Sequence, residues 1–465
     1  MSTTGSTASY ATYNPATGAL LEHYENLTSA QISEALDNAV ATQRRWRTTS
    51  FGARAELLRK VGRLLRERKS HYAFFITREM GKPLAEAEAE VLKCATACDW
   101  FADNAAALLA DEDAPSNAAH SYVAFRPLGV LLAIMPWNYP FWQVIRAAAP
   151  ALMAGNVIVL KHAANVTACA LALFEVFRDA GFPTGTFSTI LVDTFAMEPV
   201  VTDERIAAVT LTGSEGAGSA VGAAAGRAIK RVVLELGGSD AYIVLADADI
   251  DAAASTGVRA RFQNTGQSCI AAKRFIIEDA VYDAFVERFV AGARALKVGD
   301  PMLPDTTIGP LARIDLRDGL HRQVQATLAA GGKLLLGGGL IDGPGAYYEP
   351  TIVGDVLPGM AMADEETFGP AAALMRARDA EHAIELANSS RYGLGGSLWT
   401  RDLKRAAILA ARLESGGVFI NGMTASDPRL PFGGVKKSGH GRELGEFGIR
   451  EFVNVQTVWI GPATP

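Results

Sequence analysis

The chain has 465 residues, a length that predicts two or three domains around a shared cleft rather than one simple core. Its residues are 49% hydrophobic and 20% charged, proportions that exclude the disordered, collagenous and coiled-coil classes. The formal net charge of −6 gives no sign of the basic face that nucleic acid requires, so we expect a small-molecule partner and no nucleic acid.

The cysteines and the N-terminus indicate a reducing compartment. Four cysteines are too few for a disulfide framework at this length, and none forms the C-x-x-C pair that binds zinc. The first residues lack the basic start and apolar core of a secretory signal. One uncharged stretch, 127–145, contains Pro127, Pro136 and Pro140, which would break a spanning helix. We predict a cytoplasmic protein with no membrane segment and no metal site.

In chain order, the first predicted elements are helices. Ser29 can cap a helix whose Ile32, Leu36 and Val40 share one face, and the 3.6-residue period returns over 51–69. A further helix is expected over 85–109.

From residue 130 onward, short apolar runs alternate with helical stretches. The runs predict strands at 130–134, 157–160, 188–192 and 207–211. Apolar strands separated by helices are typical of a doubly wound parallel sheet. The alternation starts again at 242–245 and 274–277, with a helix expected at 281–296. The predicted fold class is therefore α/β, with a second α/β domain.

Two alternating segments, 121–125 and 451–459, fit neither sheet. Edge strands with an apolar face promote aggregation unless another subunit covers them. We therefore predict a small β element that assembles the chain into a homo-oligomer, a dimer or a tetramer.

Candidate chemistry begins with Cys269, which follows a helical pattern in a glycine-containing stretch where a turn can present its thiol. A lone cysteine is more often a small core residue, and we keep that interpretation for Cys94, Cys98 and Cys169. Asn138 follows the strand at 130–134, at the edge where α/β proteins bind ligands.

Glu235 lies between two leucines, where burial without a partner would be costly. Burial raises the pKa of a carboxyl group and makes it a usable general base near neutral pH. Glu235 is therefore a candidate base.

Six segments resemble the signature motifs of the aldehyde dehydrogenase superfamily, in the family's order and over nearly the whole chain. They are 136–138, 213–218, 234–238, 264–269, 365–370 and 431–436. Within the family, segments 161–163 and 426–429 make the chain similar to the bacterial succinate-semialdehyde dehydrogenases. The resemblance implies a Rossmann-type cofactor-binding domain (1–112 and 128–236), an α/β catalytic domain (237–445) and a small β oligomerisation element (113–127 and 446–465).

The resemblance also implies a mechanism. The Cys269 thiolate would attack the aldehyde, and the Asn138 amide and the backbone N–H of Cys269 would hold the oxyanion. The thiohemiacetal would pass its hydride to NAD or NADP, and Glu235 would activate the water that hydrolyses the thioester.

The cofactor is expected at the carboxyl edge of the first sheet. A strict G-x-G-x-x-G is absent, but a helix that starts after Gly213 and Ser214 can face the pyrophosphate. Relatives that prefer NAD often have glutamate at the position of Ala164; without that repulsion, we expect NADP to be tolerated beside NAD. The resemblance implies eleven cofactor-binding residues, namely Met135, Pro136, Trp137, Lys161, Ala164, Gly213, Ser214, Gly218, Leu236, Glu366 and Phe368.

The residues expected at the substrate are Arg146, Trp142, Ser268 and Ser426. In the succinate-semialdehyde enzymes, an arginine at the position of Arg146 binds the substrate carboxylate, which a planar guanidinium can hold in two hydrogen bonds. A structural salt bridge is the alternative interpretation of Arg146.

Where some relatives have a second arginine, this chain has Gln263, so carboxylate binding is weaker or Arg429 compensates. The sequence thus predicts oxidation of succinate semialdehyde to succinate. The alternatives are another short aldehyde, such as glutarate semialdehyde or a neutral aliphatic one, and a non-catalytic binding protein on the same fold.

Overall fold

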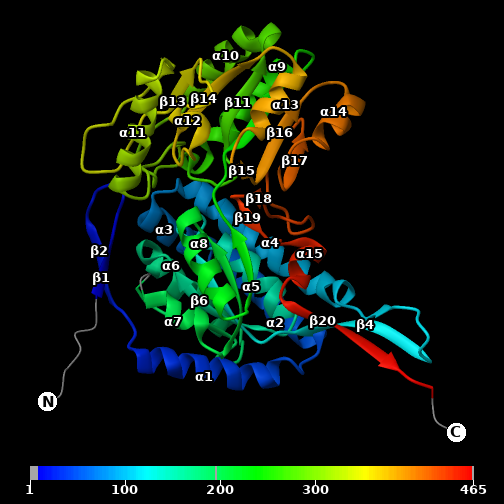
Figure 1. Ribbon diagram of the computed structural model, residues 1–465. Coiled ribbons are helices and arrows are strands. Elements are labelled where there is room, and N and C mark those ends of the chain that lie inside the picture. Colours follow the sequence, from blue (N-terminus) through cyan, green and yellow to red (C-terminus); the bar gives the residue numbers. More distant parts are fainter. Residues whose placement is uncertain (1–8, 194–195, 463–465) are drawn as a thin grey trace.

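The computed structural model describes residues 9–193 and 196–462. Two α/β units are stacked, and a β arm projects from the lower unit (Figure 1). An N-terminal hairpin of β1 (Ser9–Tyr13) and β2 (Leu20–Glu25) lies along one side. No helix of the described chain is long and apolar enough to cross a membrane.

The lower unit contains a six-stranded sheet in the order β19-β9-β8-β5-β6-β7. Strands β5 to β9 are parallel, whereas the short β19 runs antiparallel to β9. Their bounds are β5 Val130–Met135, β6 Val157–His162, β7 Phe187–Thr189, β8 Ile206–Thr212, β9 Arg231–Glu235 and β19 Gly439–His440. The strand predicted at 188–192 corresponds to β7, which is shorter and starts one residue earlier. Segment 431–445, assigned above to the catalytic domain, contributes β19 to this sheet.

Helices cover the lower sheet. They are α1 Ser29–Trp46, α2 Phe51–Glu67, α3 Lys69–Met80, α4 Leu84–Leu108, α5 Trp142–Met153, the short η1 Ala164–Val166, α6 Thr167–Asp179, α7 Met197–Thr202 and α8 Glu215–Arg227. The cap of α1 is Thr28 rather than Ser29, because the Thr28 hydroxyl accepts from Gln31 N while the Gln31 side chain accepts from Thr28 N.

The upper unit contains a seven-stranded sheet in the order β12-β13-β14-β11-β10-β16-β17, parallel except for β12. Its strands are β10 Asp240–Val244, β11 Ala272–Glu278, β12 Lys333–Leu336, β13 Thr351–Gly354, β14 Ala371–Ala377, β16 Gly395–Trp399 and β17 Gly417–Ile420. Its helices are α9 Ile250–Phe262, η3 Gln263–Gly266, α10 Asp279–Arg294, α11 Ile314–Ala329, α12 Ala361–Asp364, α13 Ala380–Asn388 and α14 Leu403–Ala410.

The apolar runs in the upper strands follow from burial on both faces of the sheet. Successive side chains of a strand point to opposite faces. In β10, Ala241 and Ile243 pack in one hydrophobic cluster, and Tyr242 and Val244 pack in another.

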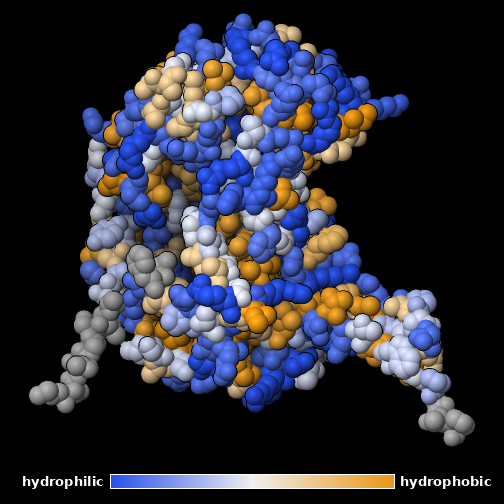
Figure 2. Space-filling model, viewed as in Figure 1, coloured by the Kyte–Doolittle hydropathy of each residue, from blue (hydrophilic) through white to orange (hydrophobic). Residues whose placement is uncertain are grey.

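The arm is a three-stranded antiparallel sheet of β20 (Val453–Ile460), β4 (His120–Pro127) and β3 (Glu112–Asp113). The two segments that fitted neither main sheet therefore pair with each other. Hydrophobic residues gather where the arm meets the body (Figure 2). The short α15 (Gly445–Arg450) leads from the body into β20, and the pair β15 (Tyr392–Gly393) and β18 (Val435–Lys436) lies between the two units.

Candidate active site

The strand order of the lower sheet places a crevice at its carboxyl edge. Strands β5 and β8 are neighbours, but the chain proceeds from β5 to β6 on one side and from β8 to β9 on the other. Loops that leave such a switch point in opposite directions open a ligand crevice. Here a cavity lies between the units, lined by Pro136, Trp137, Asn138, Gln143, Thr212, Gly213, Ser214, Leu236, Gly237, Cys269, Arg313, Leu316, Glu366 and Phe368.

A second cavity lies on the other side of Cys269. Cys269 belongs to the lining of both cavities, so its side chain stands at their junction. The second cavity contains all four predicted substrate residues, Arg146, Trp142, Ser268 and Ser426. One residue can therefore meet two ligands that enter from different sides.

The loop before Cys269 has an unusual backbone. Asn264, Thr265 and Gly266 have φ of 57°, 56° and 70°, in the left-handed region that residues with a Cβ avoid. Asn264 Nδ2 donates to Asn138 O at 2.9 Å and to Gln267 O at 3.0 Å, and Asn264 N donates to Glu86 at 2.7 Å. These contacts fix the nucleophile loop against the β5–α5 loop.

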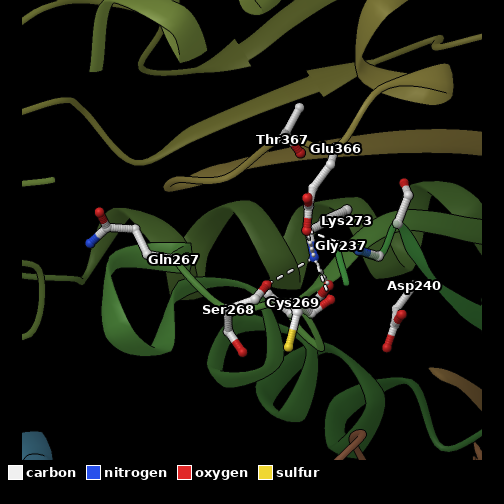
Figure 3. A network of polar contacts seen from close by, with 12 residues as sticks. Gly237, Asp240, Gln267, Ser268, Cys269, Lys273, Glu366 and Thr367 are labelled. Carbon is white, nitrogen blue, oxygen red and sulfur yellow. Dashed lines mark hydrogen bonds and ion pairs between the residues drawn. The ribbon is translucent and has the colours of Figure 1, made fainter. Parts of the chain in front are cut away.

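Lys273 anchors the loop after the turn. Its Nζ donates to the carbonyl oxygens of Ser268 at 2.9 Å and Cys269 at 2.7 Å, and lies 3.6 Å from Glu366 (Figure 3). The Cys269 sulfur points away from this ammonium (Figure 3). Lys273 therefore positions the backbone of Cys269 and leaves the thiol facing the cavities.

Burial raises the pKa of the Cys269 thiol to about 11, although the charges of Arg146 and Lys273 oppose the shift. At neutral pH this thiol is protonated, so it needs a base before it can attack a carbonyl carbon.

Asn138 is buried and lines the same cavity as Cys269. Its Nδ2 donates to Gln267 O at 3.0 Å, and its Oδ1 accepts from Gln143 Nε2 at 3.1 Å. These two bonds fix the orientation of the amide. An amide nitrogen carries two hydrogens, so the second one can be donated to an oxyanion formed on a substrate.

Glu235 ends β9 and is 2% exposed. Neither of its carboxylate oxygens accepts a hydrogen bond from any residue that the structure describes. Burial raises the pKa of Glu235 well above its usual range, and the Glu443 charge raises it further, while Arg146 and Arg442 oppose the shift. Glu235 therefore holds a proton more readily than an exposed glutamate does, and it is a stronger base once ionised.

Arg146 forms a buried ion pair with Glu443, and its Nη2 donates to Thr212 Oγ1 at 3.2 Å. The salt bridge that was the alternative interpretation is therefore present. Arg146 also lines the second cavity, so the pair does not remove it from contact with a ligand. Whether it binds the substrate stays a prediction.

The first cavity has features that fit a dinucleotide. Helix α8 starts directly after Gly213, and its cap Ser214 accepts from Ala217 N at 3.3 Å. The amides and the dipole of such an N-terminus favour phosphate. Glu366 accepts from Gly238 N at 2.9 Å, and a Cβ on Gly237 would lie 2.2 Å from the Glu366 carboxylate, so a side chain there would displace that carboxylate.

Across the same cavity, the rings of Trp137 and Phe368 meet edge to face, with centroids 5.7 Å apart. The remaining predicted cofactor residues, Met135, Lys161, Ala164 and Gly218, lie outside both linings as the described chain defines them. Lys161 lies near the end of β6, Ala164 begins η1, and Gly218 packs α8 against Leu236.

Sequence reasoning missed Lys93, Gln143, Lys273 and Glu443. Lys273 lies four residues after Cys269, where a buried basic side chain is an unusual signal in itself. Lys93 and Glu443 have no local signal, because tertiary folding alone brings them to the site.

Comparisons with known proteins agree with this geometry. Residues 2–458 match the aldehyde dehydrogenase family. A succinate semialdehyde dehydrogenase of Escherichia coli, named for NAD(P)+, is 53% identical over 96% of both chains. A succinate-semialdehyde dehydrogenase of Mycobacterium tuberculosis, named for NADP+, is 51% identical over 97% of this chain and 99% of the relative. The crystal structure of the Streptococcus pyogenes succinic semialdehyde dehydrogenase with NADP+ is 36% identical, with a TM-score of 0.95 over 97% of this chain and 100% of that one.

Proposed function

This chain belongs to the aldehyde dehydrogenase family, and we propose that it oxidises succinate semialdehyde to succinate with NAD or NADP as the hydride acceptor. The observation that carries the proposal is the place of Cys269 at the junction of two cavities. One has a helix N-terminus and a carboxylate suited to a dinucleotide, and the other has cationic side chains suited to an acidic aldehyde.

The reaction starts with the thiol. Glu235 takes the proton of Cys269, and the thiolate attacks the aldehyde carbon to form a thiohemiacetal. The Asn138 amide and the Cys269 N–H hold the oxyanion while the bond forms. Lys273 keeps the Cys269 backbone in place through its bonds to two consecutive carbonyl oxygens.

When bound, the oxidised nicotinamide supplies the hydride acceptor. Gly213, Ser214 and the first turn of α8 would hold the pyrophosphate, and Glu366 would hold the nicotinamide ribose. Trp137, Leu236 and Phe368 would border the ring.

After hydride loss, Cys269 carries the substrate as a thioester. Once Glu235 has released the Cys269 proton to solvent, its carboxylate takes a proton from water, which attacks the thioester carbon. The C–S bond breaks, and return of that proton to the leaving thiolate releases the acid and restores the thiol. A buried carboxyl with a raised pKa is a stronger base than an exposed one, which suits this step.

The assembly and the compartment are part of the proposal. The apolar residues of β20 support a homo-oligomer, since Val455 and Trp459 are 56% and 52% exposed. Four free cysteines support a reducing compartment such as the cytoplasm.

The test is a panel of aldehydes assayed with NAD and with NADP by absorbance of the reduced cofactor. Succinate semialdehyde, glutarate semialdehyde and butanal separate chain length from charge. We expect the highest kcat/KM with succinate semialdehyde and measurable turnover with both cofactors. A higher kcat/KM with butanal would contradict the proposed substrate, and absence of turnover with every aldehyde would contradict the enzyme.

A further inference from the structure

Lys93 of α4 lines the cavity on the substrate side of Cys269. Its Nζ donates to Ser426 Oγ at 2.7 Å and lies 4.2 Å from the centroid of the Trp142 ring. The ammonium is thus held between two residues of the cavity wall by a hydrogen bond and by the face of an indole.

The cavity has a second cation, Arg146, but the charge of Arg146 is compensated. Glu443 pairs with it in the interior, so a carboxylate that enters the cavity meets a nearly neutral pair. Burying an acidic group beside a neutral pair is costly, because the acid loses its hydration without gaining a counter-charge. Another cation would offset this cost.

Lys93 can supply that charge. Two carboxylates act on the charge of Lys93, and each is paired with another cation: Glu90 of the same cavity with Lys82, and Asp427 with Arg429. Burial and the repulsion of Arg146 lower the pKa of Lys93 to about 8. A carboxylate beside the ammonium would relieve both effects, so the site favours an anionic ligand.

Ser426 is prepared to donate to the same ligand. Its Oγ accepts from Trp142 Nε1 at 3.1 Å and from Lys93 Nζ at 2.7 Å. A hydroxyl oxygen has two lone pairs and one hydrogen. Because both lone pairs are engaged, Ser426 can only donate its hydroxyl hydrogen to a ligand. A ligand carboxylate can accept that hydrogen, whereas a ligand N–H or O–H group would find no acceptor there.

We propose that Lys93 determines specificity by binding the far carboxylate of the aldehyde substrate, with Ser426 as its hydrogen-bond partner. This inference rests on the proposed function, because it names a residue that selects an acidic aldehyde over a neutral one.

The test compares Lys93→Met, Lys93→Gln and Lys93→Arg with wild type, using succinate semialdehyde and butanal, which have the same number of carbon atoms. Loss of a charge-assisted hydrogen bond should lower kcat/KM for succinate semialdehyde about tenfold to hundredfold, mainly through KM. Butanal should change less than about threefold, and Lys93→Arg should keep part of the selectivity. The matched control is Lys69→Met. Lys69 begins the neighbouring helix α3 and pairs with Glu88 of α4, so this variant should behave as wild type.

The outcomes separate the two proposals. Unchanged selectivity in both neutral variants, with a wild type that prefers the acid aldehyde, overturns the role of Lys93 alone. An equal fall in kcat/KM for the two aldehydes, with an unchanged circular dichroism spectrum, also overturns the role of Lys93. A wild type that prefers butanal overturns the proposed substrate and this inference together.

Discussion

At the scale of single residues, burial controls the chemistry of this site. It keeps Cys269 as a thiol at neutral pH, and it raises the pKa of Glu235, which makes the ionised carboxylate a better base for that thiol. Arg146 opposes the effect of burial at both groups, so it stabilises the Cys269 thiolate and the Glu235 carboxylate alike.

The role of Cys269 predicts the effect of Cys269→Ala. The thiol forms the covalent intermediate, while the loop around it is fixed by Lys273 and Asn264 through backbone contacts. We therefore expect loss of dehydrogenase turnover with cofactor binding retained, measured by steady-state assay and by fluorescence titration with NADPH. Substantial turnover by this variant would end the proposed mechanism.

Glu235→Gln should separate the two half-reactions. An amide cannot take a proton from water, so thioester hydrolysis should slow, while acylation persists wherever another base or hydroxide ionises Cys269. Stopped-flow absorbance should show a burst of reduced cofactor and then poor steady-state turnover.

The raised pKa of Glu235 also sets the direction of the pH dependence. Its ionised fraction grows as pH rises toward that pKa, so wild-type kcat should rise with pH, and the rise should be smaller in Glu235→Gln. Identical pH profiles, or an unchanged steady-state rate, would remove Glu235 from the role of base.

At the scale of elements, helix α5 carries the substrate side of the site, and a buried acid fixes its start. Glu90 accepts from Phe141 N at 2.9 Å and from Trp142 N at 3.0 Å, and it also pairs with Lys82. A carboxylate at a helix N-terminus satisfies amides that have no partner within the helix. Trp142 and Arg146 therefore project from a helix whose first turn cannot shift freely.

The substitution Arg146→Ala tests which of its two roles matters. If the guanidinium binds the substrate carboxylate, kcat/KM for succinate semialdehyde should fall about tenfold to hundredfold while that for butanal falls far less. If Arg146 acts only as the partner of Glu443, kcat/KM should fall equally for both aldehydes, because an uncompensated buried Glu443 would raise the pKa of Glu235 further.

The double variant Arg146→Ala/Glu443→Gln distinguishes the two roles, because it removes the uncompensated charge. If kcat/KM recovers for butanal but not for succinate semialdehyde, the result supports carboxylate binding by Arg146. Equal recovery for both aldehydes would show that Arg146 is structural.

The sequence could predict those elements that neighbouring residues determine. The strands at β5, β6, β8, β10 and β11 and the cap of α8 are encoded by neighbouring residues, and so is the order of the family motifs. Lys93 and Ser426, which contact each other, are 333 positions apart in the chain. Strand β19 can pair with β9 only because the C-terminal part of the chain returns to the lower sheet. No local pattern encodes such contacts, so the wall of the substrate cavity could be predicted only in part.

At the scale of the whole molecule, the stacking of the two units creates the site. The lower unit supplies Asn138, Glu235 and the start of α8, and the upper unit supplies Cys269 and Glu366. The nucleophile and the Asn138 amide, one of its two oxyanion donors, therefore lie in different units. Any motion between the units would change the distance between Cys269 and Asn138, so contacts that hold the units together also support catalysis.

The arm supplies the last prediction. Strand β20 ends its sheet, so one of its backbone edges has no neighbouring strand within the described chain, and Val455 and Trp459 lie on the same face because residues of one face recur every second position. We expect wild type to elute as a dimer or tetramer of the 49.2 kDa chain in size-exclusion chromatography with light scattering. Val455→Asp/Trp459→Asp should shift it to smaller species, because two carboxylates in an apolar interface would be desolvated without partners. Asn454→Asp/Gln456→Glu places the same charge on the opposite face and serves as the control. A monomeric wild type, or equal dissociation of the two double variants, would contradict an interface on the Val455–Trp459 face of β20.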